Sequence, residues 1–397
     1  MKSDKTTPNV PTLRFQEFTN PWTLMPLKKL LCFQNGINAD SAKYGKGVKF
    51  ISVSDILNNQ YITYDCIKGM IDIDKKTKER FLVEYGDILF QRSSETFEDI
   101  GRANVYLDKE HPATFGGFVI RGKKISEYNP MFFRYLLCTP NARKQTVRMG
   151  AGAQHYNIGQ DGLGKISLYF PTIQEQQKIA GFLSAIDDRI SVQNKIIEDL
   201  KILKKELCNK VFSKGTAVRL GELIEEVTVR NKSNACDNVL SVSNKMGFIK
   251  QSEQFEDRTI ASENKSNYKV VTKGCFAYNP ARINVGSIAL LSSHSVGIIS
   301  PMYVCFKAKN VLDSTYLSFY YQSNFFAREL QKKLEGSVRQ CLTYENMRET
   351  IIPYVDIERQ REIATTLNRF TMLIATEEKC LKALQKQKTY FLNAMFI

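Results

Sequence analysis

The feature that most constrains this chain is a long stretch of helical periodicity between residues 171 and 212. From Ile179 onward, aliphatic residues recur at alternating steps of four and three, which is typical of a helix packed along a partner helix. No proline interrupts the stretch, and a helix over residues 174–212 would be about 58 Å long at 1.5 Å per residue. A helix of that length needs a partner to cover its apolar stripe.

The partner is a second copy of the pattern in the same chain. A shift of 184 residues places residues 358–396 on residues 174–212 without a gap. Polar residues interrupt the two apolar seams at matching steps, Gln193 with Glu377 and Lys204 with Lys388, and such residues tend to fix register and partner choice. The chain is therefore an internal duplication. The apolar seam residues are Ile179, Leu183, Ile186, Ile190, Ile197, Leu200 and Leu207 in the first copy and Ile363, Leu367, Phe370, Ile374, Leu381, Leu384 and Phe391 in the second.

Composition indicates a globular protein with a polyanionic partner. Hydrophobic residues make up 43% of the chain and charged residues 24%, as in ordinary globular domains. The net charge of +15 is shared by both halves, which favours nucleic acid as the partner. Nine cysteines without a CxxC pair and three histidines predict reduced thiols in the cytoplasm rather than disulfides or a zinc site. The N-terminus lacks the apolar core of a signal peptide, and no apolar run reaches membrane-spanning length.

The two copies also match, more faintly, outside the helices. Residues 50–54 pair with 239–243 as expected short strands, and residues 86–90 pair with 274–278 as a turn glycine leading into a strand. We expect an α+β fold: two tandem mixed α/β domains joined by two long helices that form a pseudo-twofold antiparallel coiled coil. The helices should be antiparallel because few residues join the first helix to the second domain. The expected segments are an N-terminal arm at 1–20, domains at 21–170 and 214–353, and spacer helices at 171–213 and 354–397.

The start of the first helix carries a family resemblance. A domain that contains the run Gly-Asp-Ile-Leu at 86–89 is followed by Pro171, Glu175, Gln176, Ile179 and Leu183. In these residues the chain resembles the specificity (S) subunit of type I restriction–modification enzymes. The resemblance covers nearly the whole chain in the order domain, helix, domain, helix. The second copy keeps Gln360 but has Arg359 where Glu175 stands. We expect Glu175, Gln176 and Gln360 to belong, with the seam residues, to the coiled-coil and subunit interface.

The resemblance implies a non-catalytic protein. Each domain would read one half of a bipartite asymmetric DNA sequence, and the helices would set the gap between the halves. Two methyltransferase (M) subunits carrying S-adenosylmethionine would dock on the helical region, and two restriction (R) subunits using ATP and Mg would join the full complex. No cofactor or metal is expected in this chain. A rod of about 58 Å beside DNA that rises 3.4 Å per base pair corresponds to contacts about one to one-and-a-half helical turns apart.

Side chains on loops that follow strands or small-residue turns are candidates for reading base edges, since hydrogen-bonding residues on loops can reach into the grooves. Lys245 is a candidate for phosphate contact. The base-reading candidates are Gln91, Arg92, Ser93, Ser94, Gln154, His155 and Tyr156 in the first domain and Asn279, Arg282, Asn284, Arg339 and Gln340 in the second.

Two other functions remain open at this stage. A stand-alone DNA adenine methyltransferase needs a cofactor motif, but residues 279–282 (Asn-Pro-Ala-Arg) match only the first half of the Asn-Pro-Pro-aromatic signature, and no glycine-rich strand–helix turn accompanies them. A duplicated coiled-coil adaptor would bind proteins, and its affinity would lack the linear dependence on log salt of a phosphate-contacting protein.

Overall fold

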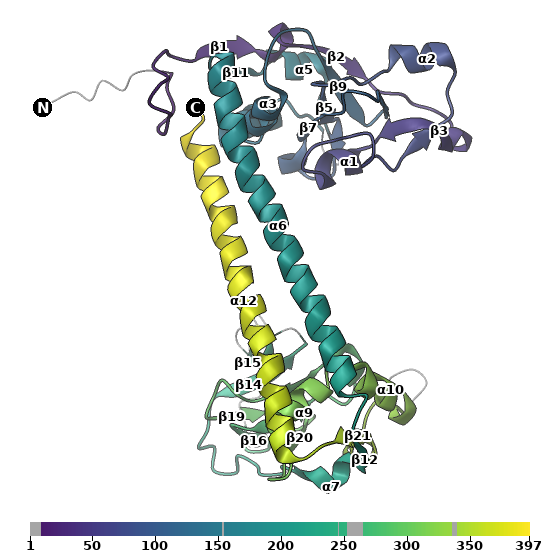
Figure 1. Ribbon diagram of the computed structural model, residues 1–397, viewed down its shortest axis with the longest axis vertical. Helices are drawn as coiled ribbons and strands as arrows, with labels where there is room; N and C mark the ends of the chain where they lie inside the picture. Colours follow the sequence, from purple (N-terminus) through teal and green to yellow (C-terminus); the bar gives the residue numbers. More distant parts are fainter. Residues whose placement is uncertain (1–8, 153–154, 245, 252–264, 336–339) are drawn as a thin grey trace, which may run out of the picture. The chain divides into compact units, whose positions relative to one another are not determined.

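The computed structural model describes residues 9–152, 155–244, 246–251, 265–335 and 340–397. The chain divides into two compact units, each containing one globular body and parts of both long helices (Figure 1). Unit 1 comprises Met1–Gln193 with Cys380–Ile397, and unit 2 comprises Asn194–Lys379. Within the part of the chain that the structure describes, no helix is both long and apolar enough to span a bilayer.

The globular body of unit 1 is built on a four-stranded antiparallel sheet in the order β2-β9-β5-β7. A smaller sheet, β4-β3-β8, and two strand pairs, β1-β11 and β6-β10, complete it. The strands are β1 (Thr23–Pro26), β2 (Leu31–Asn35), β3 (Tyr44–Ile51), β4 (Met70–Ile71), β5 (Ile88–Gln91), β6 (Ser93–Ser94), β7 (Ala103–Val105), β8 (Thr114–Phe115), β9 (Val119–Lys124), β10 (Tyr156–Asn157) and β11 (Ser167–Phe170).

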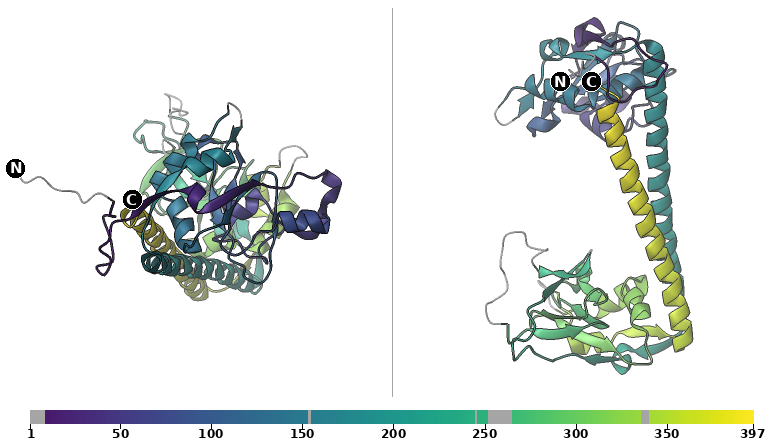
Figure 2. Two further views of the ribbon diagram at one scale, coloured as in Figure 1. Left: turned by 90° about the horizontal axis from the view of Figure 1, so that it is seen from above. Right: turned by 90° about the vertical axis from the view of Figure 1, so that its left-hand side faces the viewer.

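Unit 2 repeats the strand order of the main sheet, and its second sheet has one strand more. Its main antiparallel sheet is β13-β20-β17-β18, its second sheet is β15-β14-β19-β16, and β12 pairs with β21. The strands of unit 2 lie to one side of the last long helix (Figure 2, right). They are β12 (Thr216–Arg219), β13 (Ile224–Glu226), β14 (Val239–Ser243), β15 (Gly247–Lys250), β16 (Lys269–Thr272), β17 (Cys275–Tyr278), β18 (Ile288–Leu290), β19 (Val296–Ile299), β20 (Val304–Ala308) and β21 (Ile351–Tyr354).

Short helices cover these sheets, and their sequences explain where they begin. Helix α3 starts with Pro130 at its first position, and Asn129 accepts the backbone N–H of Phe132 at 2.9 Å. Asp313 caps α9 in the same way. Such caps satisfy N–H groups that have no partner inside a helix. The short helices are α1 (Val53–Asn58), α2 (Lys75–Arg80), α3 (Pro130–Leu137), α4 (Pro140–Arg148), α5 (Gln160–Lys165), α7 (Leu220–Leu223), α9 (Ser314–Tyr320), α10 (Asn324–Lys333) and α11 (Tyr344–Arg348), with 3₁₀ turns at Leu27–Lys29, Ser41–Lys43, Phe97–Asp99 and Ile283–Val285.

The two long helices are α6 (Ile173–Val211) and α12 (Ile357–Ala394). In unit 1 the beginning of α6 packs on the end of α12, where the rings of Phe182 and Phe391 are 4.8 Å apart. In unit 2 the later part of α6 meets the middle of α12, where Lys201 Nζ lies 2.6 Å from Glu378 Oε1. The helices are therefore antiparallel, as the sequence predicts. Every seam residue named above is buried or half-buried.

Residues 9–20, expected as part of a polar arm, lie against the ends of the long helices in unit 1. The backbone N–H of Leu13 donates to Ala394 O at 2.8 Å, and Arg14 forms a salt bridge with Glu175. The ring of Phe15 is 6.2 Å from that of Phe182. This segment thus covers apolar and charged groups of α6.

The strand expected over residues 50–54 is present only at its start. Strand β3 ends at Ile51, and Val53 begins helix α1. Ser52 and Asp55 form a capping box, with the backbone N–H of Ser52 donating to Asp55 Oδ2 at 2.8 Å. This reciprocal cap favours a helix start over two further strand residues. The matching segment β14 is a strand, and Gly86 and Gly274, at φ +92° and +87°, turn the chain into β5 and β17 as expected.

Candidate nucleic-acid interface

The structure brings the two predicted base-reading segments of unit 1 together. Strand β5 leads through Arg92 into β6, and β6 pairs antiparallel with β10, so that Ser94 faces Tyr156 and Ser93 faces Asn157. Ser93 Oγ donates to Asn157 Oδ1 at 2.5 Å across this pair. Segments 64 residues apart in the sequence thus form one surface. Gln154 lies outside the described residues.

A depression of about 490 Å³ opens at this surface. Its lining is rich in hydroxyl, amide and carboxylate groups, the types that read base edges. Thr96 Oγ1 donates to Asp99 Oδ2 at 2.8 Å, and Arg102 Nε lies 2.7 Å from Asp99 Oδ1, so this carboxylate is already engaged by the chain. The lining residues are Gln91, Ser93, Ser94, Glu95, Thr96, Asp99, Phe118 and His155.

Gln91 lies at the floor of the depression rather than at its rim. Its side chain is 6% exposed, and Nε2 donates to the carbonyl oxygen of Ser93 at 2.9 Å. Among the described residues, Oε1 of Gln91 has no hydrogen-bond partner. Reversing the amide would place two acceptors against each other, so the donated bond fixes its orientation. In this arrangement Gln91 positions Ser93, which is half-buried, while His155 is exposed.

Phe118 is a member of this surface that the sequence interpretation did not select. It is 70% exposed, the largest exposure among the large apolar side chains described in unit 1. It follows Gly116 and Gly117 in the turn before β9. The sequence feature that could have identified Phe118 is an aromatic residue directly after two glycines. This feature is weak evidence, because many exposed aromatic residues have no function.

Tyr156 pairs with Ser94 but does not line the depression. It is half-buried, and its ring stands edge-on to that of Phe97 at a centroid distance of 5.2 Å. Arg92, also half-buried, donates from Nη1 to Gly117 O at 3.2 Å. Part of the predicted set therefore supports the surface, and part presents side chains on it.

Unit 2 brings its predicted segments together as well. The backbone N–H of Leu342 donates to Pro280 O at 3.1 Å, which places exposed Gln340 beside the turn that carries Asn279. Asn279 is buried, and its Oδ1 accepts the N–H of Ala281 at 3.1 Å, so this amide shapes the turn.

Two further candidates of unit 2, Arg282 and Asn284, are exposed on that turn. Lys245 and Arg339 lie outside the described residues.

The predicted interface residues Gln176 and Gln360 hold each globular body to a long helix. Gln176 Oε1 accepts the N–H of Asn129, the cap of α3, at 2.9 Å, and its Nε2 donates to Pro171 O at 3.0 Å. Gln360 Oε1 accepts the N–H of Asp313, the cap of α9, at 2.8 Å. The same residue in each copy therefore fixes the same helix start.

Glu175 is 1% exposed and has partners within unit 1. Arg14 donates to both of its oxygens at 2.7 Å, and Trp22 Nε1 donates to Oε1 at 3.2 Å. Arg359, at the matching place in the second copy, instead forms an exposed pair with Glu362.

The seam lysines Lys388 and Lys204 each lie near an aromatic ring at matching places, but their charged neighbours differ. Lys388 pairs with Asp187, and its Nζ lies 5.8 Å from the ring centre of Tyr135 in unit 1. Tyr135 donates to Asp187 at 2.8 Å, and burial first and the nearby carboxylate second raise the pKa of this tyrosine. Lys204 lies 5.2 Å from the ring centre of Phe319 in unit 2, and burial lowers its pKa.

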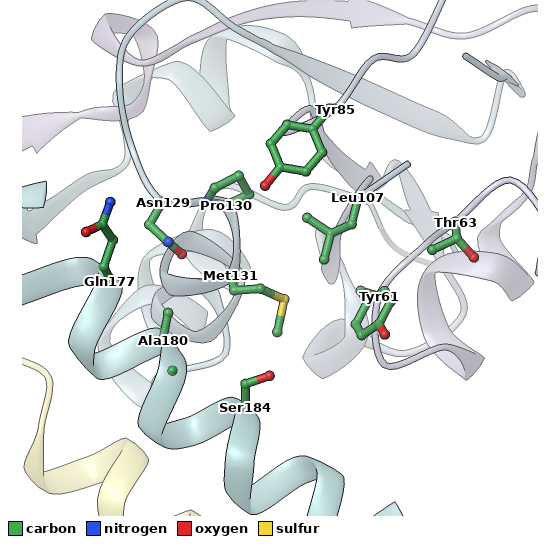
Figure 3. Close-up of a pocket in the computed structure, with 11 residues that line it drawn as sticks. Tyr61, Thr63, Tyr85, Leu107, Asn129, Pro130, Met131, Gln177, Ala180 and Ser184 are labelled. Carbon is green, nitrogen blue, oxygen red and sulfur yellow. The ribbon is translucent and has the colours of Figure 1, made fainter. Parts of the chain in front are cut away.

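A second pocket, of about 570 Å³, lies beside α6 in unit 1. Figure 3 shows Tyr61, Tyr85 and Met131 on one side and Ala180 and Ser184 of α6 on the other. The lining carries no charged side chain. It offers apolar and aromatic surface with a few hydroxyl and amide groups, which suits part of a protein better than a nucleic-acid backbone. Among the described residues, no group of His, Cys, Asp or Glu is arranged to hold a metal ion.

Comparisons with known proteins agree with the duplicated architecture. The family model described as "Type I restriction modification DNA specificity domain" matches residues 22–201 and again residues 216–386. Two curated relatives are from Methanocaldococcus jannaschii. A putative type I restriction enzyme MjaX specificity subunit is 23% identical, covering 96% of this chain and 93% of its own length. The type I restriction enzyme MjaVIII specificity subunit is 24% identical, covering 90% of each chain.

Two solved structures share the fold. The type I restriction–modification S subunit from M. genitalium has a TM-score of 0.57 at 15% identity, with 98% of this chain and 99% of that chain covered. A chain from a structure concerned with complex assembly and conformational transition of the type I R-M system also has a TM-score of 0.57, at 14% identity, covering 94% and 96%. Because the family model matches most of the chain in two successive copies, the chain belongs to the type I restriction–modification specificity (S) subunits.

Proposed function

We propose that this chain is the non-catalytic DNA-recognition subunit of a type I restriction–modification complex, and that each unit reads one half of a bipartite asymmetric site. The observation that carries the proposal is the meeting of β6 and β10 at one hydrogen-bonding depression in unit 1. The net charge of +15 favours a polyanionic partner. One duplicated strand order with two different loop sets supports two different half-sites.

The long helices are the part we assign to gap setting and to partner docking. When helices are already paired, apolar side chains that remain exposed on them indicate a surface on which another protein can dock. The exposed apolar residues on α6 and α12 are Val192, Ile196, Ile202, Leu203, Met372, Leu373 and Tyr390.

The pocket in Figure 3 supports docking on α6 of unit 1. Gly181 lines it, and a Cβ built there would meet nothing within 4 Å. The packing of this chain therefore does not require a glycine at this position, and a glycine inside a helix costs about 1 kcal/mol relative to alanine. The close approach of a partner protein to this face of α6 would explain why glycine is present here. Thr365 occupies the matching position of the second copy.

The inferred partners are double-stranded DNA, two methyltransferase subunits carrying S-adenosylmethionine, and two restriction subunits using ATP and Mg. This chain would supply no cofactor of its own. All nine cysteines are free thiols, which supports a cytoplasmic location.

Selection of duplexes from a random pool by the full chain tests the function. We expect one sequence with two specified half-sites and an unspecified gap of fixed length, and an affinity that falls linearly with log salt. Arg282→Ala should lower the preference at a base of one half-site by about 1–3 kcal/mol. Arg359→Ala, at an exposed arginine on α12, is the matched control and should leave the selected sequence unchanged.

The two other functions give different results in the same assays. An adaptor would enrich no duplex, and a stand-alone methyltransferase would bind labelled S-adenosylmethionine by itself in equilibrium dialysis. The comparisons support neither alternative.

A further inference from the structure

Phe118 is exposed at a place where the surrounding chain is tightly fixed. The backbone N–H of Arg92 donates to Phe118 O at 2.8 Å, and the N–H of Val119 donates to Gly116 O at 2.8 Å. Arg92 Nη1 donates to Gly117 O at 3.2 Å. The turn that carries the ring is thus bonded on both sides of the aromatic residue.

Two glycines of this turn lie in close contact with neighbouring side chains. A Cβ on Gly117 would lie 1.6 Å from Asn38 Oδ1, and a Cβ on Gly116 would lie 2.5 Å from the ring of Phe50. A side chain at either position would have to displace Asn38 or Phe50, so glycine is favoured at both. The backbone that carries Phe118 is therefore held by hydrogen bonds and close packing and is not a loose loop.

The ring stands beside groups that suit base edges. Phe118 lines the same depression as Ser93, Glu95 and His155. An apolar side chain next to hydrogen-bonding groups matches the major-groove edge of a base pair that contains thymine, because only thymine places a methyl group there. An aromatic side chain has only two rotatable torsions, so ordering it on binding costs little conformational entropy.

We propose that Phe118 is a specificity-determining residue that contacts the 5-methyl group of a thymine in the half-site read by unit 1. The inference rests on the proposed function, since it requires that unit 1 bind DNA. It adds the chemical group read and the residue that reads it. The neighbouring hydroxyl and carboxylate groups then face the polar atoms of the same or the adjacent base pair.

The test replaces each thymine of the selected half-sites by uracil, which removes only the methyl group. For the wild-type full chain, one such replacement should weaken binding about fourfold, the factor that corresponds to about 0.8 kcal/mol for a buried methyl at 1.4 kcal/mol per tenfold. Phe118→Ala should bind the thymine duplex about fourfold more weakly and should not distinguish thymine from uracil there. Phe118→Leu, which keeps an apolar contact, should retain part of the discrimination.

Two controls separate recognition from folding. Phe118 is mostly exposed, so Phe118→Ala should unfold at the wild-type temperature. Leu24→Ala removes another exposed apolar side chain of unit 1, on β1 outside the depression. It should keep both the affinity and the discrimination between thymine and uracil.

The outcomes distinguish the inference from the function on which it rests. If the wild-type chain enriches no sequence, the proposed function fails. If it selects a site but Phe118→Ala keeps full discrimination at every thymine, the inference alone is wrong. Equal weakening of thymine and uracil duplexes by Phe118→Ala would mean that the ring contacts another feature of DNA, and that also overturns it.

Discussion

Removing the Arg14 side chain should destabilise unit 1 because it would leave a buried carboxylate without its counter-ion. Both oxygens of Glu175 accept from Arg14 at 2.7 Å, and Trp22 Nε1 is its other hydrogen-bond donor, at 3.2 Å from Oε1. Among the described residues, Arg14→Met would leave the indole N–H as the one side-chain donor to this carboxylate. Breaking a buried ion pair from one side costs about 3–5 kcal/mol. Since Arg14 is 13% exposed, we expect the lower end, about 3 kcal/mol.

The assay can follow unit 1 alone. Trp22 is the single tryptophan of the chain and is 2% exposed beside the ion pair. Its fluorescence during urea unfolding therefore reports on this unit. With a slope of about 1–3 kcal/mol per M, a loss of about 3 kcal/mol lowers the midpoint by about 1–3 M. A chain of two units need not unfold in one step, so the transition seen by Trp22 is assigned to unit 1 alone.

The second copy supplies the matched control. Arg359 takes the place of Glu175 and pairs with Glu362 at 2.6 Å, with both side chains more than half exposed. Exposed pairs contribute about 0–1 kcal/mol, so Arg359→Met should leave the Trp22 midpoint in place. The double variant Arg14→Met with Glu175→Met removes both charges and should recover most of the loss. Equal midpoint shifts for Arg14→Met and Arg359→Met would refute the reasoning.

Three further predictions concern other parts of the chain. One heptad inserted at matching points of α6 and α12 adds about 10.5 Å to each helix. It should lengthen the gap between the half-sites by about three base pairs and leave both half-sites intact. Sequencing of the bound duplexes measures the gap, and an unchanged gap would contradict the prediction. Phe396→Ala should cost unit 1 about 3–5 kcal/mol in the tryptophan assay, whereas Phe212→Ala in unit 2 should not move that transition. Burial raises the pKa of Cys275 to about 11 and of Cys305 to about 12, so at pH 8 an aromatic disulfide reagent should label exposed Cys32 and Cys138 in the native chain and the two buried thiols only after denaturation.

The long helices could be predicted because their signal is local and repeated. The seam recurs at a fixed period, and the observed bounds of α6 and α12 lie within two residues of the expected 174–212 and 358–396. Strands β5 and β17 were predictable for a related reason, since a glycine with positive φ marks each start. The strand predicted over residues 50–54 ends early because Ser52 and Asp55 form a capping box that starts helix α1. Alternation of apolar residues does not reveal such a cap.

The candidate site was less accessible from sequence because it depends on distant neighbours. Ser94 and Tyr156 were both selected, but nothing local shows that they pair. Gln91 has the right residue type for reading a base, and only its burial shows that it holds Ser93. Arg14 is 161 residues from its carboxylate partner Glu175. Chemistry was therefore predictable by residue type, and position was not.

The contacts of the helix ends explain why the two copies must act as a pair. Phe212, from the first copy, packs on Tyr316 in unit 2, with their ring centroids 4.8 Å apart. Phe396, from the second copy, packs on Phe132 in unit 1, with their ring centroids 5.3 Å apart.

Phe132 and Tyr316 are themselves 184 residues apart, so the two contacts are equivalent. Each copy thus completes the core of the body made by the other, with Lys204 and Lys388 repeating the exchange. A single copy would leave a buried aromatic site open, at a cost comparable to a Phe→Ala substitution in a core, about 3–5 kcal/mol. Such a half-chain can close both sites only by pairing with a second copy of itself, and identical loops on both would then select a symmetric sequence in place of an asymmetric one.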